Sequence, residues 1–165
     1  MKSQPYIRNA TLEDCATIAT IYNQYVGTAT METNRTDAYY FQKMMEDFND
    51  RERFYVMELK NEGIISWAKI TRYSYKKGYS TACETAVFFD GKWLRKGYGT
   101  VFKKFVIEEC KNLGYRHLVA KIFADNEASI EYNKKLGYEV VGIQRKIGFV
   151  NGHWQDVALM QLVLE

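Results

Sequence analysis

The chain has few of the residues that cross-link or interrupt a fold. Its 165 residues include one proline and three cysteines, Cys15, Cys83 and Cys110. Three scattered cysteines do not make a disulfide framework or a zinc site, so we interpret them as reduced core thiols of a cytoplasmic protein. No apolar run approaches the roughly 18 residues of a membrane span. The segment Met1–Tyr6 also lacks the apolar stretch of a signal peptide. We therefore expect neither an integral membrane protein nor a secreted one.

The chain also lacks a strong excess of either charge. It has 23 Lys and Arg against 20 Asp and Glu, a net charge of +3. The lysine pairs 76–77, 103–104 and 134–135 are scattered, which is typical of solvent-facing helix surfaces and does not favour RNA or DNA binding. A site for a small anion would use the same surplus. An apolar content of 47% with 15% aromatic residues predicts a folded core, and the length fits a single domain over residues 1–165.

Extended and helical patterns alternate along the chain, which predicts a mixed α/β domain. We expect a central mixed β-sheet of about seven strands flanked by helices. The Asn151-Gly152 dipeptide between the last two strands is a strong hairpin signal. The predicted strands cover residues 6–9, 54–60, 64–73, 83–89, 117–122, 138–147 and 154–163. The predicted helices cover residues 12–25, 37–49, 97–113 and 126–136.

The most informative segment joins an apolar strand end, Val87–Phe89, to the helix that follows residue 96. Gly97 and Gly99 open that helix, and Arg95 and Lys96 stand just before it. The first turn of a helix has unpaired N–H groups and a partial positive charge, which attract phosphate. Glycines allow an anion to approach the backbone closely. The alternative is that both glycines only permit tight packing of the helix on the strand.

Two common phosphate motifs do not fit this segment. A dinucleotide fingerprint needs a third glycine where Phe102 stands, and a P-loop needs Ser or Thr where Trp93 follows Gly91-Lys92. A pyrophosphate site of another kind remains. The run Leu94–Gly99 resembles the acetyl-CoA motif of the GNAT N-acetyltransferases, Gln/Arg-x-x-Gly-x-Gly/Ala, with Leu94 in the first position.

The resemblance extends over nearly the whole chain and narrows to the phosphinothricin/methionine-sulfone acetyltransferase branch. It implies the GNAT acyl-CoA N-acyltransferase fold, with a splayed central sheet. The matching segments are 7–11, 21–23, 28–33, 67–69, 72–73, 126–130, 136–138, 148–149, 154–157 and 159–161.

For the cosubstrate, the resemblance implies acetyl-CoA and no metal. Its pantetheine arm would lie along the last strand residues before the loop, and its pyrophosphate would lie at the turn into the helix. Asn126 would contact the pantetheine arm from a second helix start, although a plain N-cap role explains an Asn there equally well. The residues implied for cosubstrate binding are Val87, Phe88, Phe89, Arg95, Lys96, Gly97, Tyr98, Gly99, Thr100 and Asn126.

Glu84 is the candidate catalytic base. It lies three residues before Val87 in an otherwise apolar strand, and it matches the catalytic Glu of the branch. A carboxylate there could accept the ammonium proton directly or through water. The alternative is a strand-end Glu that faces solvent or pairs with a Lys. The acid stays unassigned, because Asn133 stands where the branch often has His, and Tyr132 is one place early.

The resemblance implies a substrate side formed by Met31, Lys69, Arg72 and Tyr73. Arg presents a planar fork that suits carboxylate, phosphinate or sulfone oxygens. Residues 69 and 72 have odd separation on a strand, so a bulge or twist is needed if both meet one ligand. The alternative for both charges is an exposed strand end. Trp67 and Trp154 are further candidates for an apolar wall.

The predicted function is transfer of an acetyl group from acetyl-CoA to the amino group of a small amino-acid-like substrate, of phosphinothricin, methionine sulfoximine or methionine sulfone type. Direct attack needs orientation and no covalent enzyme intermediate. Another amine, a protein N-terminus, or a non-catalytic acyl-CoA-binding module are the alternatives. The resemblance further implies a homodimer. His117 and His153 have no metal-ligand spacing.

Overall fold

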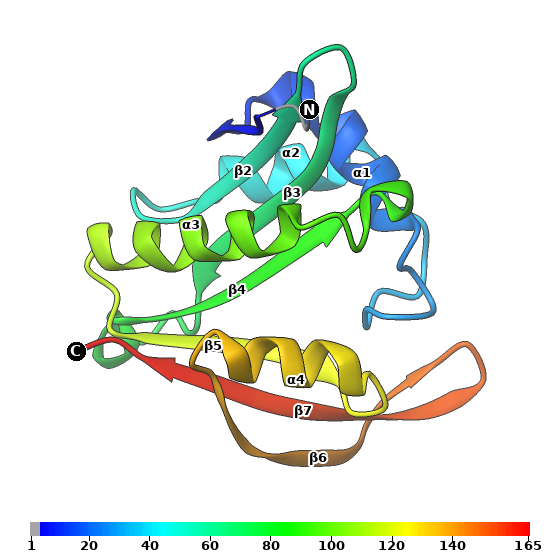
Figure 1. The fold of residues 1–165 in the computed structure, drawn as a ribbon. Helices are drawn as coiled ribbons and strands as arrows, with labels where there is room; N and C mark the ends of the chain where they lie inside the picture. Colours follow the sequence, from blue (N-terminus) through cyan, green and yellow to red (C-terminus); the bar gives the residue numbers. More distant parts are fainter. Residues whose placement is uncertain (1–3) are drawn as a thin grey trace. The chain divides into compact units, whose positions relative to one another are not determined.

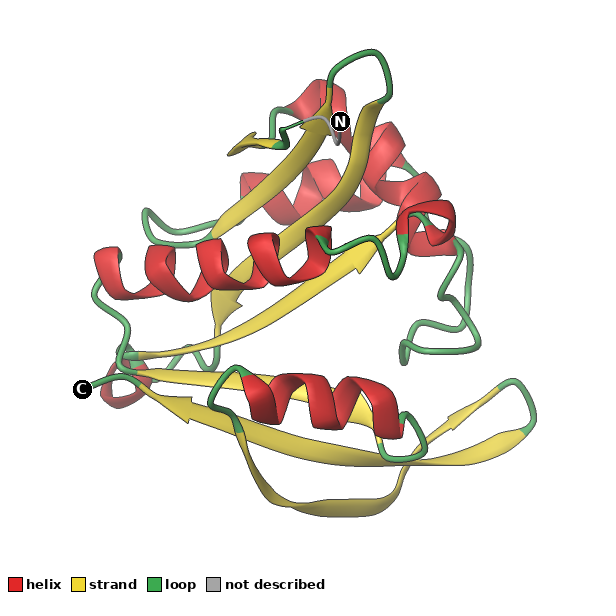
Figure 2. Cartoon of the chain, in the orientation of Figure 1, coloured by secondary structure: helices red, strands yellow, loops and turns green. Residues whose placement is uncertain are grey.

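The computed structural model describes residues 4–165, so the first three residues of the Met1–Tyr6 segment lie outside it. Strands and helices follow one another in the predicted order (Figures 1 and 2). The strands are β1 Tyr6–Asn9, β2 Arg53–Leu59, β3 Gly63–Arg72, β4 Ala82–Phe89, β5 His117–Phe123, β6 Glu139–Val150 and β7 His153–Val163. The α-helices are α1 Cys15–Asn23, α2 Ala38–Glu46, α3 Tyr98–Asn112 and α4 Glu127–Lys135.

The strands follow the order β1-β2-β3-β4-β5-β7-β6 in a mixed, seven-stranded sheet. β4 pairs with β5 in parallel, whereas β1–β2, β2–β3, β5–β7 and β6–β7 are antiparallel. The predicted mixed α/β class is therefore confirmed. The chain forms two compact units. Among the described residues, the first unit contains those up to Gln24 with Thr36–Thr71 and Thr85–Glu109, and the second contains Tyr25–Arg35, Arg72–Glu84 and Cys110–Glu165.

Aromatic side chains form the core of the first unit around Trp67 of β3, which is 1% exposed. Its ring centroid lies 5.3 Å from those of Phe41 in α2 and Phe54 in β2. It lies 4.9 Å from the ring of Phe88 in β4, where the two rings stack. Aromatic pairs of this kind add about 0.5–1.5 kcal/mol beyond the burial of their area. This cluster fixes the end of β4 within the first unit.

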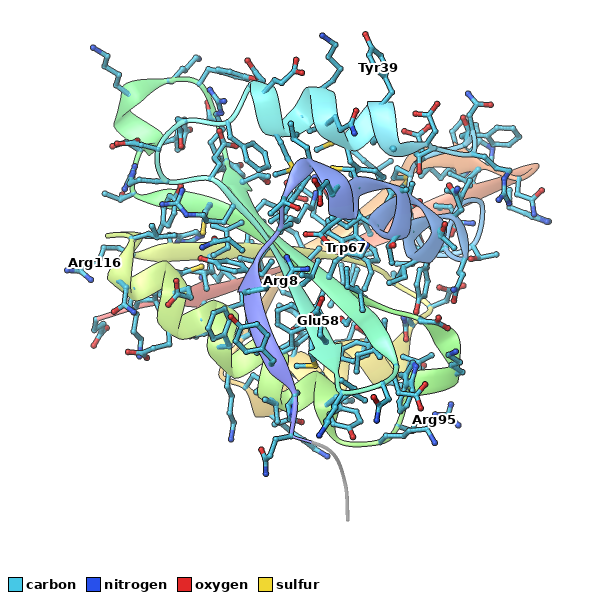
Figure 3. The ribbon with its side chains drawn as sticks, turned by 90° about the horizontal axis from the view of Figure 1, so that it is seen from above. Arg8, Tyr39, Glu58, Trp67, Arg95 and Arg116 are labelled. Carbon is cyan, nitrogen blue, oxygen red and sulfur yellow. The ribbon has the colours of Figure 1, made fainter. Side chains whose placement is uncertain are left out.

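A partly buried ion pair joins the first strand to the turn before α1. Arg8 donates to both carboxylate oxygens of Asp14, at 2.7 and 3.0 Å, and to Glu58 at 2.9 Å; Figure 3 shows Arg8 and Glu58 near one another. Asp14 also accepts the backbone N–H of Thr11 at 2.7 Å. The hydrogen bonds from Arg8 hold the pKa of Asp14 below its usual range.

The second unit contains the antiparallel ladder of β5, β7 and β6. Its Asn151-Gly152 turn has positive φ at both residues, 52° and 79°, as the hairpin signal predicts. β6 has register shifts between Val140 and Gly142 and between Gln144 and Gly148. In the second of these, Lys146 has a φ of 51° and its N–H donates to Asp156 Oδ1 at 2.7 Å. The bulge gives the strand a local bend there.

All three cysteines are buried and free, which confirms the prediction of reduced core thiols. The sulfur atoms of Cys83 and Cys110 lie 3.8 Å apart, a contact that the sequence did not predict. Across residues 4–165, no helix has both the length and the apolar character needed to cross a membrane.

Helix ends are where the structure departs from the predicted bounds. A 3-10 turn, Leu12–Asp14, precedes α1 because the Asp14 carboxylate is held on the Thr11 N–H. α2 begins after its N-cap Asp37 and ends at Glu46, three residues before the predicted end. α3 begins at Tyr98, because Gly97 has a φ of 90° and cannot be its first helical residue.

Candidate functional site

The side chains of Phe88 and Phe89, the last two residues of β4, pack against aromatic rings on opposite faces of the strand. Phe88 stacks on Trp67 and meets the ring of Tyr22 in α1 at 5.2 Å. The next residue, Phe89, points to the opposite face and meets Phe102 of α3 at 6.4 Å. Because both rings pack in the core, the main chain is what this strand end offers to a ligand.

The main-chain groups at this strand end alternate between its two edges. The carbonyl of Phe88 accepts a hydrogen bond from Ser66 Oγ at 2.9 Å, and the N–H of Asp90 donates to the Ile65 carbonyl at 2.9 Å. Residues 88 and 90 therefore face β3. Successive residues of a strand direct their N–H and C=O groups to opposite edges. Val87 and Phe89 accordingly direct theirs away from β3, where an extended ligand arm could pair with them.

The loop after β4 is fixed by its own hydrogen bonds. Asp90 Oδ1 accepts the N–H of Lys92 at 3.3 Å, and Gln24 Oε1 accepts the N–H of Gly91 at 2.8 Å. The residues Gly91–Trp93 form a 3-10 turn. These bonds hold the beginning of the loop in place while its second half, before α3, turns sharply.

The second half of the loop has a backbone suited to an anion. Arg95 has a φ of 60° and Gly97 a φ of 90°, two left-handed residues directly before α3. Left-handed residues that alternate with ordinary ones, as Arg95 and Gly97 do with Lys96 between them, can turn successive N–H groups toward one point. The helix start adds positive potential there. A left-handed non-glycine residue also carries strain, which is often found at ligand sites. The turn thus fits a diphosphate.

The side chains around this turn are of two kinds: two exposed cations and one buried aromatic ring. Arg95 and Lys96 are exposed, and Arg95 extends away from the ribbon in Figure 3. Tyr98 is 7% exposed and meets the ring of Trp93 at 6.2 Å. Tyr98 therefore anchors the helix start through its side chain and offers a ligand its main chain. Gly99 and Thr100, next along the helix, are half-buried.

Glu84 occupies β4 within the second unit and forms an ion pair. Its Oε2 atom lies 3.3 Å from Nζ of Lys121 in β5, and the two side chains are 24% and 49% exposed. The parallel register of β4 with β5 runs from Ala82↔His117 to Glu84↔Val119. The expected alternative of a Glu paired with a Lys is therefore present in the structure. The Glu84 carboxylate nevertheless remains partly exposed.

The loop that contains Met31 is ordered by its own side chains and lies against β6. The Glu32 N–H donates to Thr30 Oγ1 at 3.3 Å, and Glu32 Oε1 accepts from the Thr33 N–H at 3.1 Å. Met31 lies against Gly148, since a Cβ atom at residue 148 would overlap its Sδ and Cε atoms. Met31 remains 41% exposed.

The other predicted substrate residues have separate environments. Lys69 is half-buried opposite Phe54 of β2. The Arg72 guanidinium lies 4.2 Å from the ring centroid of Tyr75, and Tyr73, 44% exposed, meets Tyr79 at 5.3 Å.

The bulge or twist needed for residues 69 and 72 to meet one ligand stays a prediction, because the β2–β3 register is regular from Ser66 to Ile70 and does not extend to Arg72. Its shift lies at Met57/Glu58. Of the two tryptophans expected in an apolar wall, Trp67 is a core residue and Trp154 is 61% exposed.

The residues of α4 take structural roles in the described contacts. Asn126 is the N-cap, and its Oδ1 accepts the Ser129 N–H at 3.2 Å. The capping expectation is confirmed, while its contact with a pantetheine arm stays a prediction. Asn133 is 2% exposed and donates to the Ser129 carbonyl at 2.8 Å. Its amide is therefore bound within the helix, which disfavours a role with the leaving thiolate.

Within residues 4–165, no group of three or more His, Cys, Asp or Glu side chains is placed to hold an ion. His117 is half-buried on β5, and His153 is exposed at the start of β7.

Two residues near the candidate site were not predicted from the sequence. Lys121 follows the apolar run Leu118–Ala120 in β5. A positive charge in an apolar strand is a weak signal that a negatively charged side chain lies next to it. Gly148 interrupts an exposed strand, which is a known signal for close approach of another segment. Both signals were present, but neither indicates which residue is the neighbour.

Comparisons with known proteins show which proteins this chain resembles in sequence and fold. A family model described as acetyltransferase (GNAT) domain matches residues 7–159. The phosphinothricin N-acetyltransferase of Streptomyces viridochromogenes is 28% identical over 159 residues, covering 94% of this chain and 85% of that protein. The L-methionine sulfoximine/L-methionine sulfone acetyltransferase of Pseudomonas aeruginosa is 27% identical, covering 96% and 94%. An acetyltransferase structure from Salmonella typhimurium, solved with its cofactor acetyl-CoA, has a TM-score of 0.89 at 27% identity, covering 98% and 94%.

Proposed function

Because the chain belongs to the GNAT acetyltransferase family, we propose that it moves an acetyl group from acetyl-CoA to the amino group of a small amino-acid-like substrate. The substrate class is that of phosphinothricin, methionine sulfoximine and methionine sulfone, which the relatives' names specify. The observation that carries the proposal is the turn of Arg95 and Gly97 at the start of α3, joined by one short loop to the strand that contains Glu84.

The cosubstrate is proposed to bind along the main chain. Val87 and Phe89 direct their N–H and C=O groups away from β3, which suits pairing with the amides of a pantetheine arm. Phe88 is proposed to support the binding strand without pairing with the arm, because its carbonyl accepts from Ser66 and its ring stacks on Trp67. The pyrophosphate is proposed to lie on the N–H groups of the turn and helix start. The residues of that part are Arg95, Lys96, Gly97, Tyr98, Gly99 and Thr100.

The chemical step is proposed as direct transfer. Glu84 accepts a proton from the substrate ammonium, and the resulting amine nitrogen attacks the thioester carbonyl. A C–N bond forms, the C–S bond breaks, and CoA leaves as its thiolate. The nitrogen then gives its second proton to the thiolate, directly or through water, and Glu84 returns the first proton to solvent. Substrate positioning is proposed for Met31, Lys69, Arg72 and Tyr73, and contact with the pantetheine arm for Asn126. Most of the acceleration then comes from orientation and from removal of the proton.

We further propose a cytoplasmic homodimer in which residues 1–165 act as one domain. β6 is the last strand in the sheet order, and its residues Val141, Ile143, Ile147 and Phe149 are 50–57% exposed. An apolar edge of this kind favours pairing with a second copy. Light scattering should give twice the 19.3 kDa chain mass, and Ile147→Lys should shift it to the monomer. A monomeric wild type would contradict the dimer.

The experiment for the activity follows the acetylated product by mass spectrometry. Purified protein and acetyl-CoA are incubated with phosphinothricin, L-methionine sulfoximine, L-methionine sulfone, simple alkylamines and a short peptide with a free N-terminus. We expect N-acetyl products from the three amino-acid analogues. Product from the peptide alone would favour protein N-terminal acetylation. Tight CoA binding with no product from any amine would favour a non-catalytic acyl-CoA-binding module.

A further inference from the structure

Lys121 stands beside Glu84 because of the parallel register between their strands. Glu84 is opposite Val119, and Lys121 is two residues later on β5, so its side chain lies on the same face as that of Val119. On its other side, Lys121 is opposite Leu159 of β7, an aliphatic residue. The carboxylate that balances this ammonium is that of Glu84, at 3.3 Å.

This ion pair is accessible to solutes. With side chains 49% and 24% exposed, it contributes little to folding, because water screens both charges. Its charges nevertheless affect anything that binds at Glu84. A substrate ammonium that approaches this carboxylate also approaches the ammonium of Lys121, and like charges a few ångströms apart repel. A plain amine therefore meets a penalty at this position.

A substrate that brings its own negative charge escapes that penalty. In an α-amino acid, the ammonium and the carboxylate are attached to one carbon, and their separation is comparable to the 3.3 Å between Nζ and Oε2 of the pair. The ammonium can then lie at Glu84 while the carboxylate lies at Lys121, so that each charge meets its opposite. We infer that Lys121 is a specificity-determining residue that binds the substrate carboxylate and selects α-amino acids over amines without a carboxylate. This inference rests on the proposed function.

The test compares two amines that differ only in the carboxylate. L-Methionine sulfone and 3-(methylsulfonyl)propan-1-amine have the same side chain and the same reacting nitrogen. Release of the CoA thiol gives kcat and KM for each amine with the wild type, Lys121→Met and Lys121→Arg. Lys134→Met is the matched control, because Lys134 is 48% exposed and pairs with Glu131 at 3.0 Å on α4. Acetyl-CoA affinity and thermal unfolding are measured for every variant.

We expect Lys121→Met to raise KM for L-methionine sulfone at least tenfold and not to lower kcat/KM for the decarboxylated amine, because the substitution removes the ammonium that repels it. Lys121→Arg should keep most of the preference, and Lys134→Met all of it. An equal loss on both amines, or no loss on either, overturns the inference while leaving the acetyltransferase intact. A wild type that acetylates neither amine overturns the proposed function together with the inference.

Discussion

Met31 fills the space above Gly148 that any side chain at that position would need. A Cβ atom there would overlap both the Sδ and the Cε atoms of Met31. The two residues belong to a loop before α2 and to the strand β6, so this contact fixes the loop against the strand. Gly148 also ends the register shift that starts at Gln144. The position of a predicted substrate residue thus depends on the absence of a side chain elsewhere.

Gly148→Ala should therefore displace Met31. We expect KM for the amine to rise about three- to tenfold, since a displacement of about one ångström near a substrate is costly, while the acetyl-CoA affinity stays unchanged. Gly142→Ala is the matched control in the same strand, because a Cβ there meets nothing within 4 Å. Steady-state kinetics at saturating acetyl-CoA measure the effect. Equal KM values for both variants would mean that Met31 does not line the substrate site.

Gly97 tests the proposed diphosphate turn. Its φ of 90° is unfavourable for any residue with a Cβ atom, so Gly97→Ala should distort the turn at a cost of about 1 kcal/mol. We expect the affinity for CoA to fall about tenfold in isothermal titration calorimetry. Gly78→Ala serves as control, because Gly78 has open space around its Cβ position and no positive φ. Unaltered CoA binding by Gly97→Ala would remove this turn from the site.

Asp14 should make stability depend on acid pH. The hydrogen bonds from Arg8 lower its pKa in the folded state, so the folded protein binds fewer protons than the unfolded one. Its contribution is complete above the unfolded value of about 4 and is lost as the pH falls through the folded value. Asp14→Asn should lower the free energy of unfolding by about 1–3 kcal/mol at pH 7. Urea unfolding at pH 7 and pH 3 should show this difference shrinking in acid, and a difference independent of pH would contradict the assignment.

Lys103 should also make stability rise with pH, but in the alkaline range and through the loss of a destabilising charge. Burial lowers its pKa to about 8 from 10.5, so between these values the unfolded chain binds a proton that the folded chain has released. Below pH 8 the folded protein holds this lysine in its charged form despite the burial, which costs stability. Lys103→Met should stabilise the protein by on the order of 1 kcal/mol at pH 7.

Urea midpoints at pH 7, 8.5 and 10 should show the stabilisation by Lys103→Met fading toward the highest pH. The exposed neighbour Lys104, changed to Met, should give no such trend. If the stabilisation does not change with pH, its cause is not the removal of a buried charge.

Much of the fold could be predicted because its signals are local. The Asn151-Gly152 dipeptide specifies its turn through the positive φ that both residues adopt, and Asn126 was recognisable as a helix cap. Helix ends were less predictable. The hydrogen bond from the Thr11 N–H to the Asp14 carboxylate shifts the start of α1, and the left-handed conformation of Gly97 shifts the start of α3. Each shift depends on one side chain or one dihedral angle.

The candidate site was predictable as a list of residues and not as a set of contacts. Glu84 and the turn before α3 could be named from the strand pattern and the family resemblance. The partner of Glu84 could not, because Lys121 reaches it only through the register of β4 against β5. The contact between Met31 and Gly148 likewise depends on the bulged register of β6, which sets where Gly148 lies. Register is set by long-range pairing, which a single sequence does not reveal.

Glu84→Gln tests the central claim most directly, because the amide keeps the shape of the side chain and cannot accept the ammonium proton. CoA release with L-methionine sulfone gives kcat, and calorimetry gives the affinity for acetyl-CoA in the same preparation. The account predicts that kcat falls by about 10²–10⁴-fold while the acetyl-CoA affinity changes less than twofold. An unchanged kcat would contradict the role of Glu84 as the base.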